Sequence, residues 1–110
     1  MISFKAGAVV NKEAPAIAHM LARFATLPFD ITITSGNDST HKVGSKHYHD
    51  QALDVRSWTF PTATHEGIRW VLERALNATP VPPVPFRVLL ESDHFHCQVA
   101  MGHSWGDGSH

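Results

Sequence analysis

The sequence predicts an α+β domain, a small antiparallel sheet with two helices packed on it. Two segments, 17–24 and 68–76, carry apolar residues at helical spacing. Three other segments are short and are either rich in β-branched residues or alternating, as strands are: 30–34, 52–56 and 94–99. The mostly apolar segment 86–90 leads as a fourth strand towards the last of them. A chain of 110 residues suffices for one domain with a modest core, so we expect a single domain over residues 1–110.

The first half of the chain predicts a helix, a strand and a loop. We expect the helix to begin near Asn11, whose side chain can cap it, with Glu13 and Pro15 in its first turn. The β-branched run 30–34 then predicts a strand. Segment 35–44 is polar and bounded by glycines, which indicates a loop.

The second half predicts a helix followed by a hairpin. Thr64 can cap the helix. The strands 86–90 and 94–99 are close enough in the sequence to pair as a hairpin. The glycine-rich tail from Gly102 is expected to fray, although Trp105 can tuck against the body of the domain.

Charge and composition exclude several classes of partner. Nine basic and ten acidic residues give a net charge of -1, so we expect neither nucleic acid nor membrane as a partner. No apolar stretch is long enough to span a membrane, and residues 1–5 lack the start of a signal peptide. We therefore expect a soluble monomer made in the cytoplasm. The single cysteine, Cys97, excludes an intramolecular disulfide, and its place in an alternating strand predicts a buried thiol.

The first chemical motif is a loop that leads into the strand 52–56. Leu53 and Val55 alternate with Asp54, so if the apolar pair faces the core, Asp54 faces a cleft on the other side. The preceding loop can fold back and bring His47 to Asp54. Imidazole nitrogen and carboxylate oxygen are both zinc ligands, so two of four tetrahedral positions can be supplied here.

The second motif lies on the last predicted strand. His94, His96 and Gln98 alternate with apolar residues and share the face opposite to them. The two imidazoles can therefore line the same cleft as Asp54. Three protein ligands with one water are typical of a catalytic zinc site, whereas structural sites are closed by four ligands.

Plainer interpretations exist for each of these residues. The chain has nine histidines, so some pairings arise by chance, and a lone histidine is more often a surface or core residue than a ligand. Asp54 can pair with Arg56 in an ordinary salt bridge. The alternation on both strands favours the metal site, because it sends Asp54, His94 and His96 to one face and their apolar neighbours to the other.

The two motifs together resemble the D-Ala-D-Ala metallopeptidase family. The first is Ser-x-His, then Asp after six residues, with Ala two before the Asp, over 45–54; the second is an acidic residue followed by His-x-His, over 91–96. The family comprises zinc D,D-carboxypeptidases, D,D-dipeptidases and L-alanyl-D-glutamate endolysins, and its fold is shared by the hedgehog signalling domain. The resemblance covers about residues 31–99 and implies a hedgehog-like fold.

The resemblance also implies roles for individual residues. Zinc would be held by His47, Asp54 and His96, with His94 beside it to hydrogen-bond the water or the transition state. Members with Glu-x-x-His use that histidine as the ligand, which would make it His94. Glu91 matches the acidic residue of the family and is expected to be the general base.

Further roles are expected around this centre. Asp93 is the competitor of Glu91 as the base, and its plain interpretation is a turn former. Ser45 and His41 are candidate substrate-binding residues. Arg56 shares the parity of Asp54 and is a candidate partner that holds it.

The sequence departs from the family pattern at two places. Asp50 stands where the family usually has glycine, so the turn must either avoid positive φ or place an aspartate there. The family often holds the substrate carboxylate with an arginine soon after the first strand, but segment 34–41 has none, which favours an endopeptidase.

The resemblance therefore implies a zinc metallopeptidase, a hydrolase that cleaves amide bonds in peptidoglycan stem peptides or cross-links. Its specificity would be that of a D,D-carboxypeptidase or an L-alanyl-D-glutamate endopeptidase. A phage or prophage endolysin is the implied setting, because cell-wall degradation by such a chain needs delivery to the wall. Two alternatives stay open: a non-catalytic zinc-binding domain of the same fold, used for binding or stability, and a protein without metal.

Overall fold

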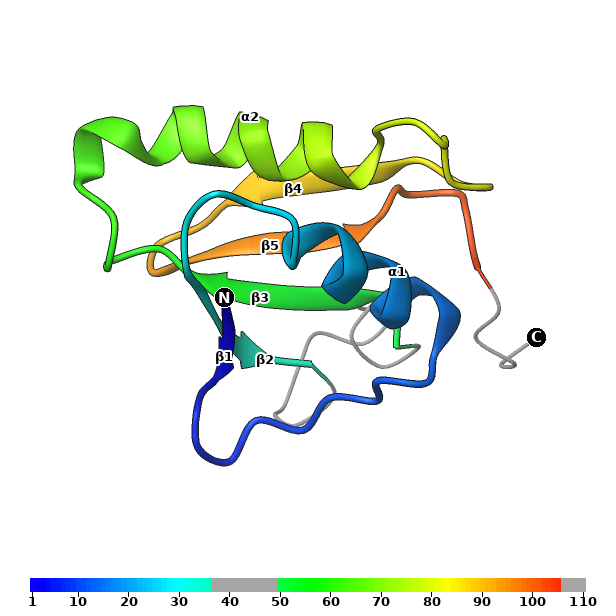
Figure 1. The fold of residues 1–110 in the computed structure, drawn as a ribbon, viewed down its shortest axis with the longest axis horizontal. Coiled ribbons are helices and arrows are strands. Elements are labelled where there is room, and N and C mark those ends of the chain that lie inside the picture. Colours follow the sequence, from blue (N-terminus) through cyan, green and yellow to red (C-terminus); the bar gives the residue numbers. More distant parts are fainter. Residues whose placement is uncertain (37–49, 106–110) are drawn as a thin grey trace.

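The computed structural model describes residues 1–36 and 50–105. These residues form five strands, two α-helices and a short 3-10 turn around one core (Figure 1). In chain order the elements are β1 (Ile2–Phe4), α1 (Pro15–Phe24), β2 (Ile31–Ser35), β3 (Ala52–Arg56), η2 (Thr62–Thr64), α2 (His65–Leu76), β4 (Phe86–Leu90) and β5 (His94–Val99). The predicted α+β class and the two helices are confirmed.

The five strands form one mixed sheet in the order β1-β2-β3-β5-β4. The pairs β2–β3, β3–β5 and β4–β5 are antiparallel, and the hairpin predicted from 86–90 and 94–99 is present as β4 and β5. The expectation of a purely antiparallel sheet is wrong, because β1 pairs with β2 in parallel. Strand β1 has three residues, too few for an alternating pattern to reveal it.

Both helices pack on one face of the sheet. Ile17 and Phe24 of α1 and Leu72 of α2 lie in a single buried cluster with Val55 of β3 and Phe95 of β5. The predicted inward residues of the last strand are all fully buried: Phe95, Cys97 and Val99. Burial raises the pKa of the Cys97 thiol, with nearby negative charges adding to the effect, so this cysteine is an inert core residue as predicted.

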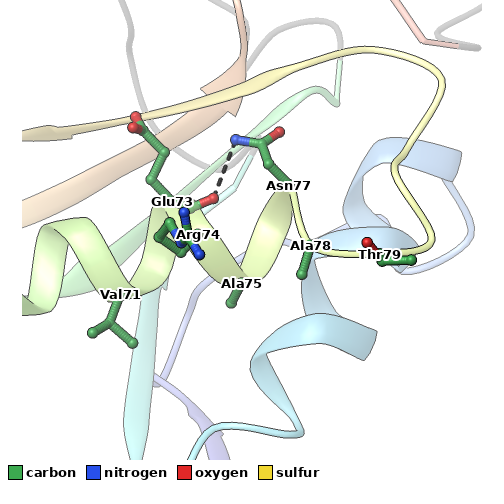
Figure 2. A pocket seen from close by; sticks show the side chains of 7 residues that line it. All are labelled: Val71, Glu73, Arg74, Ala75, Asn77, Ala78 and Thr79. Carbon is green, nitrogen blue, oxygen red and sulfur yellow. Dashed lines mark hydrogen bonds between the residues drawn. The ribbon is translucent and has the colours of Figure 1, made fainter.

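Side chains of α2 close the outer edge of the sheet along β4. The Asn77 side chain accepts from the backbone N–H of Phe86 at 2.9 Å and donates to its carbonyl at 3.0 Å. One turn earlier, Glu73 accepts from the N–H of Val88 at 2.9 Å, and Arg69 donates to the Val88 carbonyl at 3.2 Å. The Asn77 amide also donates to the Glu73 carbonyl (Figure 2). These bonds occupy edge groups that another strand would otherwise pair with.

Neither predicted capping side chain caps its helix, although α2 does begin directly after Thr64. Helix α1 begins at Pro15, and Asn11 instead accepts from the N–H of Glu13 at 3.2 Å in the preceding turn. Proline at the first helical position is favourable because its φ is already helical. Thr64 does occupy the N-cap of α2, but its hydroxyl donates to the carbonyl of Pro61 at 2.6 Å and caps no helical N–H.

The segment after β5 folds back on the core. Trp105 packs against the core, and its ring lies 6.1 Å from Phe86 between centroids. The backbone N–H of Trp105 donates to Oε1 of Gln51 at 2.9 Å, and Nε2 of Gln51 donates to the hydroxyl of Ser104 at 3.2 Å. The predicted tucking of Trp105 is confirmed, whereas residues 106–110 lie outside the described range. Among the described helices, none has the length and apolar character needed to cross a membrane.

Candidate metal centre

The register between β3 and β5 gathers the metal-capable residues on the face of the sheet away from the helices. Asp54 pairs with His96 and Arg56 pairs with His94. Because neighbouring Leu53 and Val55 are fully buried on the helix side, these four side chains project from the opposite face. The predicted alternation is confirmed, and pairing of the two strands brings both motifs together.

Asp54, His94 and His96 form a compact set of donors. Oδ1 of Asp54 lies 3.1 Å from Nδ1 of His96 and 3.6 Å from Nε2 of His94. One ligand atom from each residue lies within 4.8 Å of the others. Tetrahedral zinc with bonds near 2.1 Å needs ligand atoms about 3.4 Å apart, so small side-chain movements would close the set around an ion. These three residues can hold a metal ion.

Each imidazole has its other nitrogen fixed by a side-chain oxygen. Nδ1 of His94 lies 2.7 Å from Oδ1 of Asp93, and Nε2 of His96 lies 2.7 Å from Oε1 of Gln98. The Gln98 amide is itself oriented, because its Nε2 donates to the carbonyl of Val99 at 3.1 Å. Metal-binding histidines usually donate their second N–H to such an oxygen, which sets the tautomer and the ring direction. The sequence placed Gln98 on the correct face but gave it no role.

The acidic surroundings favour the charged form of both rings. Burial opposes that form and is the largest single influence on each pKa. For His94, the hydrogen bond that its ring donates to Asp93 and the charges of Asp54 and Glu91 together outweigh burial and raise the pKa above 6.5. For His96, the hydrogen bond and charge of Asp54 do the same. A bound cation would replace these protons, since a ligating imidazole nitrogen must be unprotonated.

Glu91 lies at the edge of the donor set, in the turn between β4 and β5. Its Oε1 is 2.9 Å from Nε2 of His94, the nitrogen that also faces Asp54. Its side chain is 49% exposed, so water reaches it. Asp93 contacts the opposite nitrogen of the same ring. Of the two candidate bases, Glu91 is therefore the one beside the space that the donors share.

Arg56 does not hold Asp54. Its guanidinium stacks over the ring of Trp58 at 4.6 Å. Across the described ranges, no ion pair joins Arg56 to a carboxylate, and its Nε is buried without a hydrogen-bond partner. The interpretation of Arg56 as the residue that holds Asp54 is therefore wrong. The aspartate is instead positioned between the two histidines.

Asp50 adopts a left-handed backbone conformation. Its φ is 54°, in the left-handed region where glycine is favoured, and it directly precedes the chain segment that enters β3. Aspartate is one of the few other residues found there, at a cost of about 1–2 kcal/mol. Its Oδ2 accepts from Nδ2 of Asn11 at 3.2 Å, which helps hold the turn. Of the two expectations for this turn, the structure shows an aspartate at positive φ.

Three predicted site residues lie outside the described residues: His41, Ser45 and His47. Their proposed roles in binding substrate and metal stay predictions. Among the described residues, the metal-capable set is Asp54, His94 and His96.

A hollow elsewhere on the surface lacks this chemistry. It lies along the C-terminal end of α2 (Figure 2) and is lined by Val71, Glu73, Arg74, Ala75, Asn77, Ala78 and Thr79. Glu73 is committed to the N–H of Val88, and the other polar lining groups are unsuited to acid–base or metal chemistry. The face of β3 and β5 is therefore the better candidate site.

Comparison with protein-family models, with curated proteins and with solved structures finds no match to this chain. The candidate site consequently rests on the sequence motifs and on the geometry of β3 and β5.

Proposed function

We propose that this chain is a zinc-dependent peptidase that hydrolyses amide bonds in peptidoglycan stem peptides or cross-links. The observation that carries the proposal is the cluster of Asp54, His94 and His96 with Glu91 at its edge, 2.9 Å from His94. A ligand set with an adjacent exposed carboxylate supplies the two parts that metal-assisted hydrolysis of an amide uses. The substrate class comes from the resemblance to D-Ala-D-Ala metallopeptidases, as does a phage or prophage lytic setting.

Asp54 and His96 supply two ligands in this proposal, and His47 supplies the third. The donor set suits zinc, which takes imidazole nitrogen and carboxylate oxygen together. His96 would ligate through Nδ1, because its Nε2 is held by Gln98. Zinc at such a site lowers the pKa of a bound water and polarises a carbonyl oxygen.

Glu91 and His94 carry the proton transfers and the charge. Glu91 accepts the proton of the attacking water and returns it to the amine that leaves. His94 faces the same space with Nε2 and donates a hydrogen bond to the oxygen that becomes negative. Asp93, at 2.7 Å from Nδ1 of His94, keeps the ring oriented and favours its protonated form.

A second ligand arrangement is supported by the position of His94. Its Nε2 is 3.6 Å from Oδ1 of Asp54, within reach of a shared ion, and Asp93 is placed to accept its other N–H. In this arrangement His94 is the third ligand, and Glu91 lies beside the open position as in the Glu-x-x-His members of the family. Both arrangements use Asp54 and His96.

The alternative function is a non-catalytic zinc-binding domain of the same fold. The close set of three donors supports this alternative. If His47 is a ligand as well as Asp54, His94 and His96, four protein ligands would close the site, as in structural zinc centres. Such a centre would contribute stability and leave no position for water.

Incubation of the zinc-loaded protein with defined muropeptides, followed by mass spectrometry of the products, tests the peptidase. We expect loss of zinc to abolish cleavage and its return to restore it. Product masses also distinguish D,D from L,D cleavage. A zinc-loaded protein that binds one equivalent of metal but leaves every muropeptide intact would support the non-catalytic domain instead.

A further inference from the structure

Arg56 lies beside the candidate metal centre on the same face of the sheet. It is directly opposite His94 in the register of β3 and β5, so the Cβ atoms of this pair are about 5 Å apart. Two residues of strand, about 7 Å, separate it from Asp54. A peptide bound at the metal centre would therefore have its neighbouring residues within reach of Arg56.

The guanidinium of Arg56 has no acidic or hydrogen-bonding partner in the part of the chain that the structure describes. Its Nε is buried and makes no hydrogen bond. The nearby carboxylates are engaged by the histidines: Asp54 contacts His96, while Glu91 and Asp93 contact His94. A half-buried cation without a counter-ion is unfavourable, and arginine keeps its charge at all ordinary pH values.

Trp58 packs against this guanidinium. The centre of the guanidinium lies 4.6 Å from the indole centroid, and the indole itself is 65% exposed. This contact uses no N–H group of the guanidinium, and the described residues offer those groups no acceptor. Two parallel N–H groups on the edge of a guanidinium match the two oxygens of a carboxylate.

We propose that Arg56, stacked on Trp58, binds a carboxylate of the peptide substrate next to the metal centre. The carboxylate belongs either to the chain terminus or to an acidic side chain near the bond that is cleaved. The identity of the ligand as a peptide rests on the proposed function, whereas the anion site rests on the placement of Arg56 and Trp58.

Three acetylated alanine-based tripeptides test the proposal: a free acid, its C-terminal amide, and an amide with a central glutamate. Binding to the zinc-loaded protein is followed by NMR at the Trp58 indole N–H, assigned with Trp58→Phe; for any peptide that is cleaved, kcat/KM is compared instead. We expect the free acid or the glutamate peptide to be preferred over the neutral amide by about 10–100-fold. Which of the two is preferred identifies the source of the carboxylate.

The Arg56→Gln variant decides the assignment. A metal ion also attracts carboxylates, so the measured quantity is the part of the preference that the substitution removes. We expect Arg56→Gln to reduce the preference to about twofold or less, and Arg56→Lys to retain part of it, because lysine keeps the charge without the planar fork. Zinc content and melting temperature of both variants check that the fold is intact.

Arg74→Gln is the matched control, because Arg74 also stacks on an exposed tryptophan, Trp70, at 5.0 Å, but on α2. It should keep the full preference. An undiminished preference in Arg56→Gln, or no preference in the parent protein, would overturn the assignment. If acidic and neutral peptides are cleaved at equal rates, the carboxylate site is contradicted but the proposed peptidase activity is not. If the preference depends on Arg56 but no peptide is cleaved, the peptidase activity is contradicted but the carboxylate site is not.

Discussion

Asp54 and His96 face each other across β3 and β5, with Oδ1 of the aspartate 3.1 Å from Nδ1 of the imidazole. The two residues are 42 positions apart in the sequence, and the strand register alone brings them together. A pair placed by the ladder of hydrogen bonds between two central strands is held more rigidly than a pair placed by loops. The candidate centre therefore lies on two interior strands of the sheet, each paired on both sides.

We expect the purified protein to bind about one zinc ion per chain, through Asp54 and His96 with one further histidine. Asp54→Ala and His96→Ala should both abolish stoichiometric binding at neutral pH, as measured by metal analysis after dialysis. The third ligand is identified by comparing His47→Ala with His94→Ala, because the variant that loses zinc has lost a ligand. Full zinc occupancy in Asp54→Ala would show that the site is misassigned.

Gln98 is expected to contribute to metal affinity without touching the metal. Gln98→Leu removes the oxygen that lies 2.7 Å from Nε2 of His96, so the ring loses its orientation. Substitutions of this kind typically reduce metal affinity by about 10–100-fold. Competition with a chromophoric chelator measures the change. Gln98→Glu keeps the acceptor oxygen and should bind zinc at least as well as the parent; equal affinity in the leucine variant would contradict the role.

Local patterns in the sequence were sufficient to predict the faces of the strands. The period of two is a property of the strand itself, so the parity of Asp54, His94 and His96 followed from their immediate neighbours. The register that pairs Asp54 with His96 is a non-local property: alternation indicated that both can line one cleft, but not which residues of the two strands lie opposite each other. For the same reason the contact of His96 with Gln98 had no role assigned to it.

The parts that the sequence did not predict depend on competition between partners. Asn11 was a reasonable helix cap, but Pro15 supplies a start that needs no cap, and the helix begins there. Arg56 shares the parity of Asp54, yet its guanidinium lies over Trp58. Strand β1 has only three residues, and its parallel pairing depends on the return of the chain through α1. None of these outcomes has a periodic signature.

The raised pKa values of His94 and His96 predict that, as the pH rises, the stability of the metal-free protein falls while its affinity for zinc increases. In the metal-free protein, the stabilisation from their charged forms is fully present below the unfolded pKa near 6.5 and is lost as the pH rises through the raised folded values. Zinc affinity should instead increase over the same window, because the ligands must lose their protons. Denaturation midpoints of both forms from pH 5 to 9 measure this.

His94→Gln provides the control for the metal-free form. It removes one titrating ring, so the fall in stability with rising pH should become shallower. A metal-free variant and parent with the same pH profile would show that His94 contributes nothing to it.

The φ of Asp50, 54°, predicts that glycine and valine at this position will affect the free energy of unfolding unequally. Asp50→Gly should change the free energy of unfolding by less than about 1 kcal/mol: glycine relieves the backbone strain, but the hydrogen bond from Asn11 is lost and the unfolded chain gains freedom. Asp50→Val should destabilise the fold by about 1–3 kcal/mol, since a β-branched residue tolerates positive φ poorly. Urea denaturation checks both. A harmless valine would mean that the turn has another conformation in solution.

Glu91→Gln separates the peptidase from the zinc-binding domain. In the parent protein, Oε1 of Glu91 lies 2.9 Å from Nε2 of His94. The glutamine amide keeps the size of the side chain and an oxygen for this contact, but it cannot accept the proton of the water. General acid–base catalysis typically contributes ~10²–10⁴-fold, so muropeptide cleavage should fall by that factor while zinc content is unchanged.

Asp93→Asn is the matched comparison: Asp93 contacts the opposite nitrogen of His94, so its loss should reduce the rate less and shift the pH profile. If Asp93→Asn proves the more damaging change, the base is Asp93. If the glutamine variant cleaves as fast as the parent and Asp93→Asn does too, neither carboxylate is the base, and the geometry around His94 serves only to position the ring.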